Sequence, residues 1–158
     1  MPSEFVCRIE IDLAIPDFMD ASVPLEQIAE KVKTEAQENI RMQRSPDGTP
    51  FFPLAKKTIS RKGFSMALFA KGIMFNALHV YQIGKNQFEV GVIPRGKPRR
   101  DLVAIIQQEQ GVQSKYGVIR RPFLGFSQKT LKWANARIER WLTERTQKAA
   151  KKFINLKY

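Results

Sequence analysis

The chain has 158 residues, one cysteine, one histidine and a formal net charge of +12. This length fits one domain, so we expect a single domain over residues 1–158 with a basic C-terminal tail from about residue 149. The lone cysteine excludes an internal disulfide, and the lone histidine leaves little for a metal site or for histidine-based catalysis. The sequence has neither an apolar run of about twenty residues nor the pattern of a secretion signal. We therefore expect no cofactor, no metal and no membrane contact, and most enzyme classes are disfavoured.

Charge is distributed unevenly along the chain. Residues 1–40 carry 3 basic and 9 acidic residues, residues 41–111 carry 12 and 4, and residues 112–158 carry 12 and 2. A basic end is typical of nucleic-acid contact, but an acidic part and a basic part also suit identical subunits that meet head to tail in a ring. Charge alone does not choose between these functions.

The first forty residues predict a strand followed by a helix. Apolar residues alternate with polar ones along the strand, and the apolar set is Phe5, Cys7, Ile9, Ile11 and Leu13. This period of two is typical of a strand with one buried face, so we interpret Cys7 as a small core residue. Residues 24–43 then predict an amphipathic helix that covers a sheet, because apolar residues recur every three or four positions. Its apolar stripe contains Leu25, Ile28, Ala29, Val32, Ala36 and Ile40.

A proline-rich segment over residues 45–54 ends this helical pattern. Pro46 and Gly48 suit the second and fourth positions of a tight turn, and Asp47 can accept a hydrogen bond from the backbone just after it. Pro50 and Pro53 stiffen the second half of the segment. Two interpretations stay open: the loop displays Phe51, Phe52 and Leu54 for docking, or the two phenylalanines cover the end of a core.

The middle of the chain predicts short elements. Residues 55–62 favour a short helical turn, and an apolar cluster from Ala67 to Leu78 favours a loop and a short helix. Two strand-like runs, residues 79–83 and 87–93, flank Gly84-Lys85-Asn86 and predict a hairpin. His79 lies in its first arm and is interpreted as structural, because no second metal-binding side chain accompanies it.

A basic loop and a glutamine-rich helix come next. Residues 94–100 contain four cations, Arg95, Lys97, Arg99 and Arg100, and no apolar side chain except those of proline. The loop either contacts phosphate or an acidic partner, or it is a solvated connector. Asp101 is expected to cap a helix to residue 110 that Gly111 terminates. Residues 112–119 are interpreted as irregular.

The last part predicts a second proline-aromatic turn and a long helix. Arg121, Pro122, Phe123 and Leu124 form the turn with Gly125, and Ser127 is expected to begin the helix, which runs to Lys148 or beyond. The fold class is therefore α+β. A small antiparallel sheet, made of the N-terminal strand and the central hairpin, packs with two long amphipathic helices and a shorter one.

Four motifs in order resemble the bacteriophage virion morphogenesis family, whose members are tail-completion or neck proteins. They are the turn at 45–54, the Leu-x-x-x-Gly segment at 68–72, the glutamine-rich helix ending at Gly111, and Arg121-Pro122-Phe123-Leu124-Gly125. The resemblance covers about residues 25–142, with Phe51 where we would expect tryptophan and Gln107 where we would expect histidine.

This resemblance implies a structural subunit rather than an enzyme. It implies a ring, expected to be a hexamer, that completes or terminates the tail at the head–tail junction. The ring would contact tail tube or sheath proteins and the head connector, with transient contact to genomic DNA in the channel. Assembly would take place in the host cytoplasm, and the mature location would be the virion. The expected interface residues are Pro46, Asp47, Gly48, Phe51, Phe52, Arg121, Pro122, Phe123 and Leu124.

Two other functions are alternatives to this one. The basic final helix and the loop at 94–100 would suit a nucleic-acid-binding module, whose affinity falls steeply with salt. An enzyme that uses Asp47 or Asp101 as acid or base lacks a supporting constellation of residues, since the turn explains Asp47 and the helix cap explains Asp101.

Overall fold

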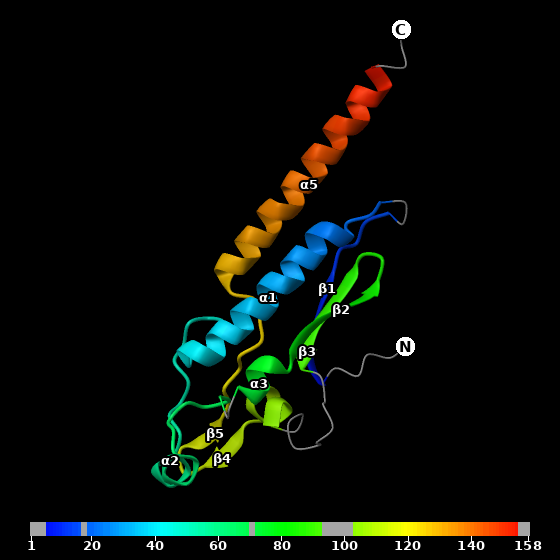
Figure 1. The fold of residues 1–158 in the computed structure, drawn as a ribbon. Helices are drawn as coiled ribbons and strands as arrows, with labels where there is room; N and C mark the ends of the chain where they lie inside the picture. Colours follow the sequence, from blue (N-terminus) through cyan, green and yellow to red (C-terminus); the bar gives the residue numbers. More distant parts are fainter. Residues whose placement is uncertain (1–5, 17–18, 70–71, 93–102, 155–158) are drawn as a thin grey trace.

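The computed structural model describes residues 6–16, 19–69, 72–92 and 103–154. A three-stranded sheet is covered on one face by the long helix α1 (Ser22–Met42), and α5 (Gln128–Ile154) lies beside α1 (Figure 1). A small region with α2 (Lys56–Lys62) and the hairpin β4–β5 (Val112–Ser114, Gly117–Ile119) lies at the end opposite the C-terminus. The predicted α+β class is confirmed.

The main sheet has the order β1-β3-β2 and is antiparallel throughout. Its strands are β1 (Val6–Asp12), β2 (Leu78–Gly84) and β3 (Gln87–Val92), so the predicted N-terminal strand and central hairpin are both confirmed. The central strand β3 directs Phe88, Val90 and Val92 into the core. A register shift interrupts β1 next to Cys7, whose side chain lies outside the described part, so its core role stays a prediction.

Helix α1 buries the predicted stripe, because all six of its apolar positions lie in the core. Pro24 lies in the first turn, where its missing N–H has no partner to lose. The helix ends at Gln43, whose backbone is left-handed at φ 54°. The side-chain amide of Gln43 forms two hydrogen bonds with the backbone of Ala67, as a neighbouring strand would. It accepts from the N–H of Ala67 at 2.6 Å and donates to the carbonyl of Ala67 at 2.9 Å.

The two short helices predicted in the middle of the chain are both present. Helix α2 ends at Gly63, whose φ of 76° suits glycine, and α3 (Ile73–Asn76) leads into β2. Residues 112–119 were predicted to be irregular, and this was wrong, since they form β4 and β5. Each strand has only three residues, which is too short for an alternating pattern to be recognised in the sequence. The hydroxyl of Ser114 stabilises the turn between them, because it accepts from the N–H of Tyr116 and donates to the carbonyl of Gly117.

The glutamine-rich helix also differs from its prediction. Asp101 and Leu102 lie outside the described residues, and residues 106–110 form a π-helix (η1, Ile106–Gln110) rather than an α-helix. Gly111 ends it as predicted, but its N–H bonds the carbonyl of Ile106 at 2.5 Å. The carbonyl of Gln107 is therefore free to accept from the N–H of Arg121 at 2.7 Å.

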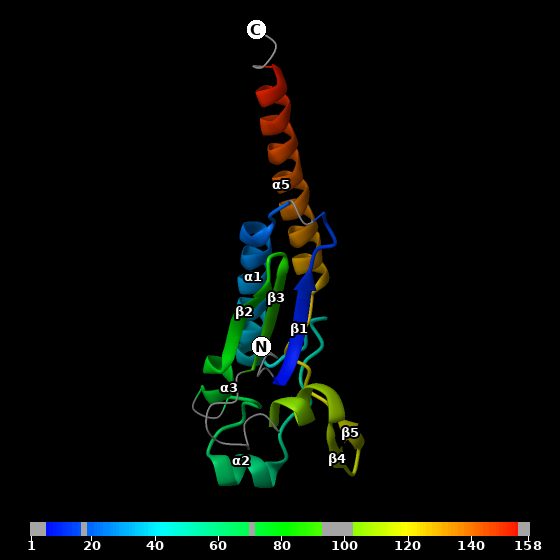
Figure 2. The same ribbon diagram turned by 90° about the vertical axis from the view of Figure 1, so that its right-hand side faces the viewer.

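Helix α5 begins at the predicted cap, since the hydroxyl of Ser127 accepts from the N–H of Thr130 at 3.0 Å. Thr130 also bonds Glu35 of α1, and Arg137 donates to the side-chain oxygen of Gln27 at 2.5 Å. The second half of α5 projects beyond the sheet (Figures 1 and 2), so the region from residue 149, predicted as a tail, continues the helix to Ile154.

Candidate functional site

The turn after α1 has the predicted geometry. The carbonyl of Ser45 accepts from the N–H of Gly48 at 2.9 Å, and Gly48 has a φ of 89°, which a side chain would disfavour. The Asp47 carboxylate accepts from the N–H of Thr49 at 2.9 Å. This hydrogen bonding from Thr49 lowers the pKa of Asp47. Asp47 is therefore explained by the turn.

The two phenylalanines after the turn differ in environment. Phe51 is 8% exposed and belongs to the core, whereas Phe52 is 43% exposed. The N–H of Phe51 bonds the carbonyl of Gln43 at 2.7 Å, which folds the loop back onto the end of α1. Of the two interpretations that the sequence left open, Phe51 therefore follows the one in which it covers the core, and Phe52 does not. Adjacent side chains of an extended segment point to opposite sides, so Phe52 is the displayed aromatic.

The second turn is also turned inward. Phe123 is fully buried and Leu124 is buried, so neither of these two expected interface residues is exposed on the subunit. The Gln108 side chain accepts from the N–H of Phe123 at 2.9 Å and of Leu124 at 3.1 Å, and it donates to the carbonyl of Leu124 at 2.7 Å. Asn39 of α1 donates to the carbonyl of Phe123 at 3.2 Å. The buried amide of Asn39 and the half-buried amide of Gln108 thus satisfy a segment with no strand partner.

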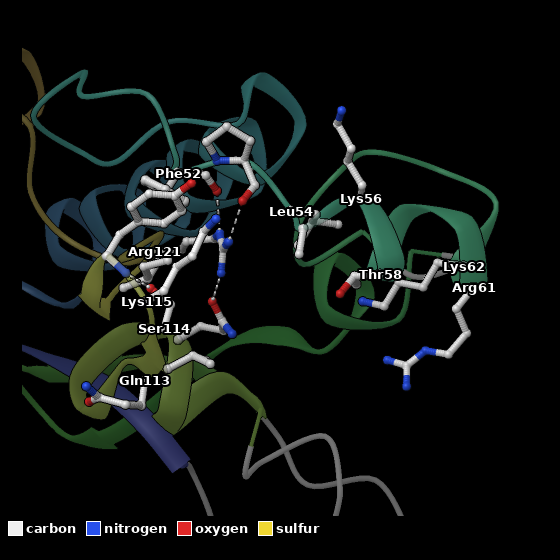
Figure 3. A pocket seen from close by; sticks show the side chains of 16 residues that line it. Phe52, Leu54, Lys56, Thr58, Arg61, Lys62, Gln113, Ser114, Lys115 and Arg121 are labelled. Atoms are coloured by element: carbon white, nitrogen blue, oxygen red, sulfur yellow. Dashed lines mark hydrogen bonds between the residues drawn. The ribbon is translucent and has the colours of Figure 1, made fainter.

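The two turns meet through Arg121. Its guanidinium donates to the carbonyls of Phe52 at 2.8 Å and Pro53 at 3.1 Å, and to the side-chain oxygen of Gln107 at 2.9 Å (Figure 3). Arg121 is 6% exposed, and burial lowers its pKa from the ordinary value. We call Arg121, Gln107 and the carbonyls of Phe52 and Pro53 the clasp. The hydrogen bonds to these three acceptors offset the free energy that the guanidinium loses when it is removed from water.

A second contact joins the turns at Gly125. A Cβ added there would lie 2.8 Å from Cγ of Pro46, well inside van der Waals contact. We expect Gly125→Ala to lower the free energy of unfolding by about 1–3 kcal/mol because the added methyl separates the turns. Urea denaturation measures this. Adding Pro46→Ala should recover part of the loss, since the two changes share one contact. Strictly additive losses would contradict the contact.

Sequence reasoning missed the glutamines and the asparagine that hold the turns. Gln43, Gln107 and Gln108 were seen as polar residues near helix ends, and Asn39 as a member of α1. Their signal is weak because an amide side chain of this kind is equally common on a solvated surface. The sequence does not show that residues 67 and 121–124, which these amides contact, have no strand partner to satisfy their backbone.

A groove lies beside the clasp, between α2 and the hairpin β4–β5 (Figure 3). Its cavity volume is about 980 Å³. Phe52 and Tyr116 form its aromatic edge, with ring centroids 5.7 Å apart, and Tyr116 is 70% exposed. Lys115 lies over the Tyr116 ring at 4.8 Å. The groove combines exposed aromatic area, which is enriched at interfaces, with positive charge.

The structure adds little on the other predicted sites, which are the basic loop at residues 94–100 and His79. Arg95, Lys97, Arg99 and Arg100 lie outside the described residues, so the structure does not place them. The ring nitrogen Nε2 of His79 is buried without a hydrogen-bond partner, and within the described ranges no three His, Cys, Asp or Glu side chains gather to hold a metal. None of the helices in this part of the chain has the length and apolarity that a membrane span needs.

The chain is thus an α+β protein whose two turns are joined by hydrogen bonds and which exposes a groove. The sequence model of the Phage virion morphogenesis family matches residues 12–143. The chain therefore belongs to the Phage virion morphogenesis family, a structural family whose members are typically not enzymes. Neither a curated protein nor a solved structure matches it.

Proposed function

We propose that this protein completes or terminates the phage tail, and that it forms a ring at the head–tail junction for joining to the head. The observation that carries this proposal is the family match over residues 12–143, which spans both proline-aromatic turns and the packed part of α5. A ring of six copies is the proposed assembly. Tail tube or sheath proteins and the head connector are the proposed neighbours.

The surface supports an assembly role. The described part exposes large apolar side chains on several elements, including Phe52, Tyr116 and Tyr81. Buried aromatics contribute much of the binding energy at interfaces, so exposed ones in a virion protein are candidate anchors. The charge distribution supports head-to-tail contacts, because an acidic patch on one copy can face a basic patch on the next.

Phe52 is the proposed anchor among the two phenylalanines of the first turn, because its side chain is 43% exposed. We expect Phe52→Ala to change the free energy of unfolding by less than about 1 kcal/mol, since the ring is largely exposed. Tail completion, measured as the yield of joined particles when purified protein is added to tails and filled heads, should fall. Trp133→Ala is the matched control because Trp133 is exposed to a similar extent on α5. Wild-type yield from Phe52→Ala would remove the anchor assignment.

A further inference from the structure

The groove beside the clasp is lined by cations on both walls. Helix α2 contributes Lys56, Arg61 and Lys62, and the hairpin contributes Lys115. None of its lining residues is Asp or Glu, while Leu54 and Ile119 add apolar area. Such a surface selects an occupant that carries carboxylates or phosphates together with apolar side chains.

The shape of the groove favours an extended protein segment over duplex DNA. A cavity of about 980 Å³ between two walls accommodates a few residues of extended chain. Duplex DNA is a thick rod, and its contacts spread along an open face. Within the described part, β4 and β5 pair only with each other, so each has an outer edge without a strand partner. Edges of this kind bind an added strand through backbone hydrogen bonds.

A segment with the required chemistry lies on the same chain. Strand β1 is at the edge of the main sheet, where its described pairing is with β3 alone. Glu10 and Asp12 lie two residues apart on β1 and are both exposed, so their carboxylates point to one side of the strand. Ile9 and Ile11 point to the other side and pack on the core. The strand therefore presents an acidic face and an edge.

We propose that β1 of one copy docks in the groove of the next copy, with Glu10 and Asp12 beside Lys56 and Lys115. The inference rests on the proposed ring and names its contact. The two surfaces belong to different parts of one subunit (Figure 2), so the contact is heterologous and repeats from copy to copy. A closed ring results where the rotation between neighbours completes a circle.

Charge exchange between two variants tests this contact. Lys56→Glu with Lys115→Glu reverses the groove, and Glu10→Lys with Asp12→Lys reverses the strand. Each double variant alone should join purified tails about tenfold less than wild type, because every contact then opposes like charges. A 1:1 mixture should restore joining, since each altered surface meets its complement in the other variant. Native mass spectrometry of released rings should show the two variants in equal numbers.

Matched controls separate this contact from general charge effects. Lys129→Glu with Lys132→Glu makes the same charge change on exposed residues of α5 and should join tails as wild type does. Thermal melts check that every variant is folded. No rescue by the mixture, with wild type joining tails normally, would overturn the contact and leave the proposed function standing. Loss of salt-dependent duplex DNA binding by the groove variant, with joining intact, would assign the groove to nucleic acid instead.

A second readout keeps the contact testable if wild-type protein never joins tails, a result that would reject the proposed function. In a Cys7→Ala background, Asp12→Cys and Tyr116→Cys are made on separate copies and mixed at high concentration under oxidising conditions. Disulfide-linked dimers that form between these positions, but not between Asp12→Cys and a Lys132→Cys control, support the contact. Equal cross-linking to both positions would overturn it.

Discussion

Phe123→Ala is expected to lower the free energy of unfolding by about 3–5 kcal/mol, the range for removing a fully buried aromatic side chain. Phe123 is 0% exposed and packs where the second turn meets the core. Its backbone is fixed by Gln108 and Asn39, so the surrounding chain has little freedom to close the cavity. Urea denaturation followed by circular dichroism measures the loss.

The control for this change is Phe52→Ala, which removes the same atoms from an exposed position and should lose far less stability. An interface role for Phe123, which the family resemblance implies, makes the opposite prediction, namely a stable Phe123→Ala subunit that fails to join tails. A loss below about 1 kcal/mol for Phe123→Ala would therefore place this ring outside the core and contradict the structure.

Arg121→Met is expected to lower the free energy of unfolding by about 2–4 kcal/mol. Methionine keeps much of the aliphatic length but leaves the carbonyls of Phe52 and Pro53 and the amide of Gln107 without their donor. Arg120→Met is the matched control, because Arg120 is the exposed neighbour, and it should stay within about 0.5 kcal/mol of wild type.

Arg121→Lys separates charge from geometry. Lysine keeps the positive charge but lacks the planar fork that reaches three acceptors at once, so it should recover only part of the loss. Full recovery by lysine would show that charge alone holds the two turns together. No loss in Arg121→Met would contradict the clasp itself.

Local patterns predicted the parts of the fold that local physics decides. The six apolar positions of α1 follow a helical period, and each of them is buried. The turn at residues 45–48 and the hairpin β2–β3 were predicted because proline fixes its own backbone angle, while glycine and asparagine tolerate the conformations that tight turns need. These elements can be predicted without knowing which distant segments they contact.

The site depended on contacts between distant segments, which the sequence does not display. Two phenylalanines in a proline-stiffened loop look alike, and only the bond from Phe51 N–H to the carbonyl of Gln43 shows which one turns inward. Phe123 is buried because Gln108 and Asn39 satisfy its backbone from 15 and 84 residues away. The two turns were singled out together only as motifs of the family resemblance, and the sequence did not predict that Arg121 joins them.

The groove could not be predicted because it is made from three separate segments. Its lining residues come from residues 52–62, Gln107 and residues 112–121, which are distant in sequence. The cations of α2 looked like an ordinary polar helix face, and β4–β5 was missed. If the clasp positions both walls, then Arg121→Met should weaken assembly as well as stability, which links the interior of the subunit to its surface.

The central claim is that the protein forms a closed ring at the end of the tail. Cryo-electron imaging of purified phage tails, with and without the added protein, tests this most directly. We predict an added closed ring of subunits at one end of each tail, with the groove of one copy facing β1 of the next. Subunits distributed along the tail shaft, or tails unchanged by saturating protein, would contradict the proposed function.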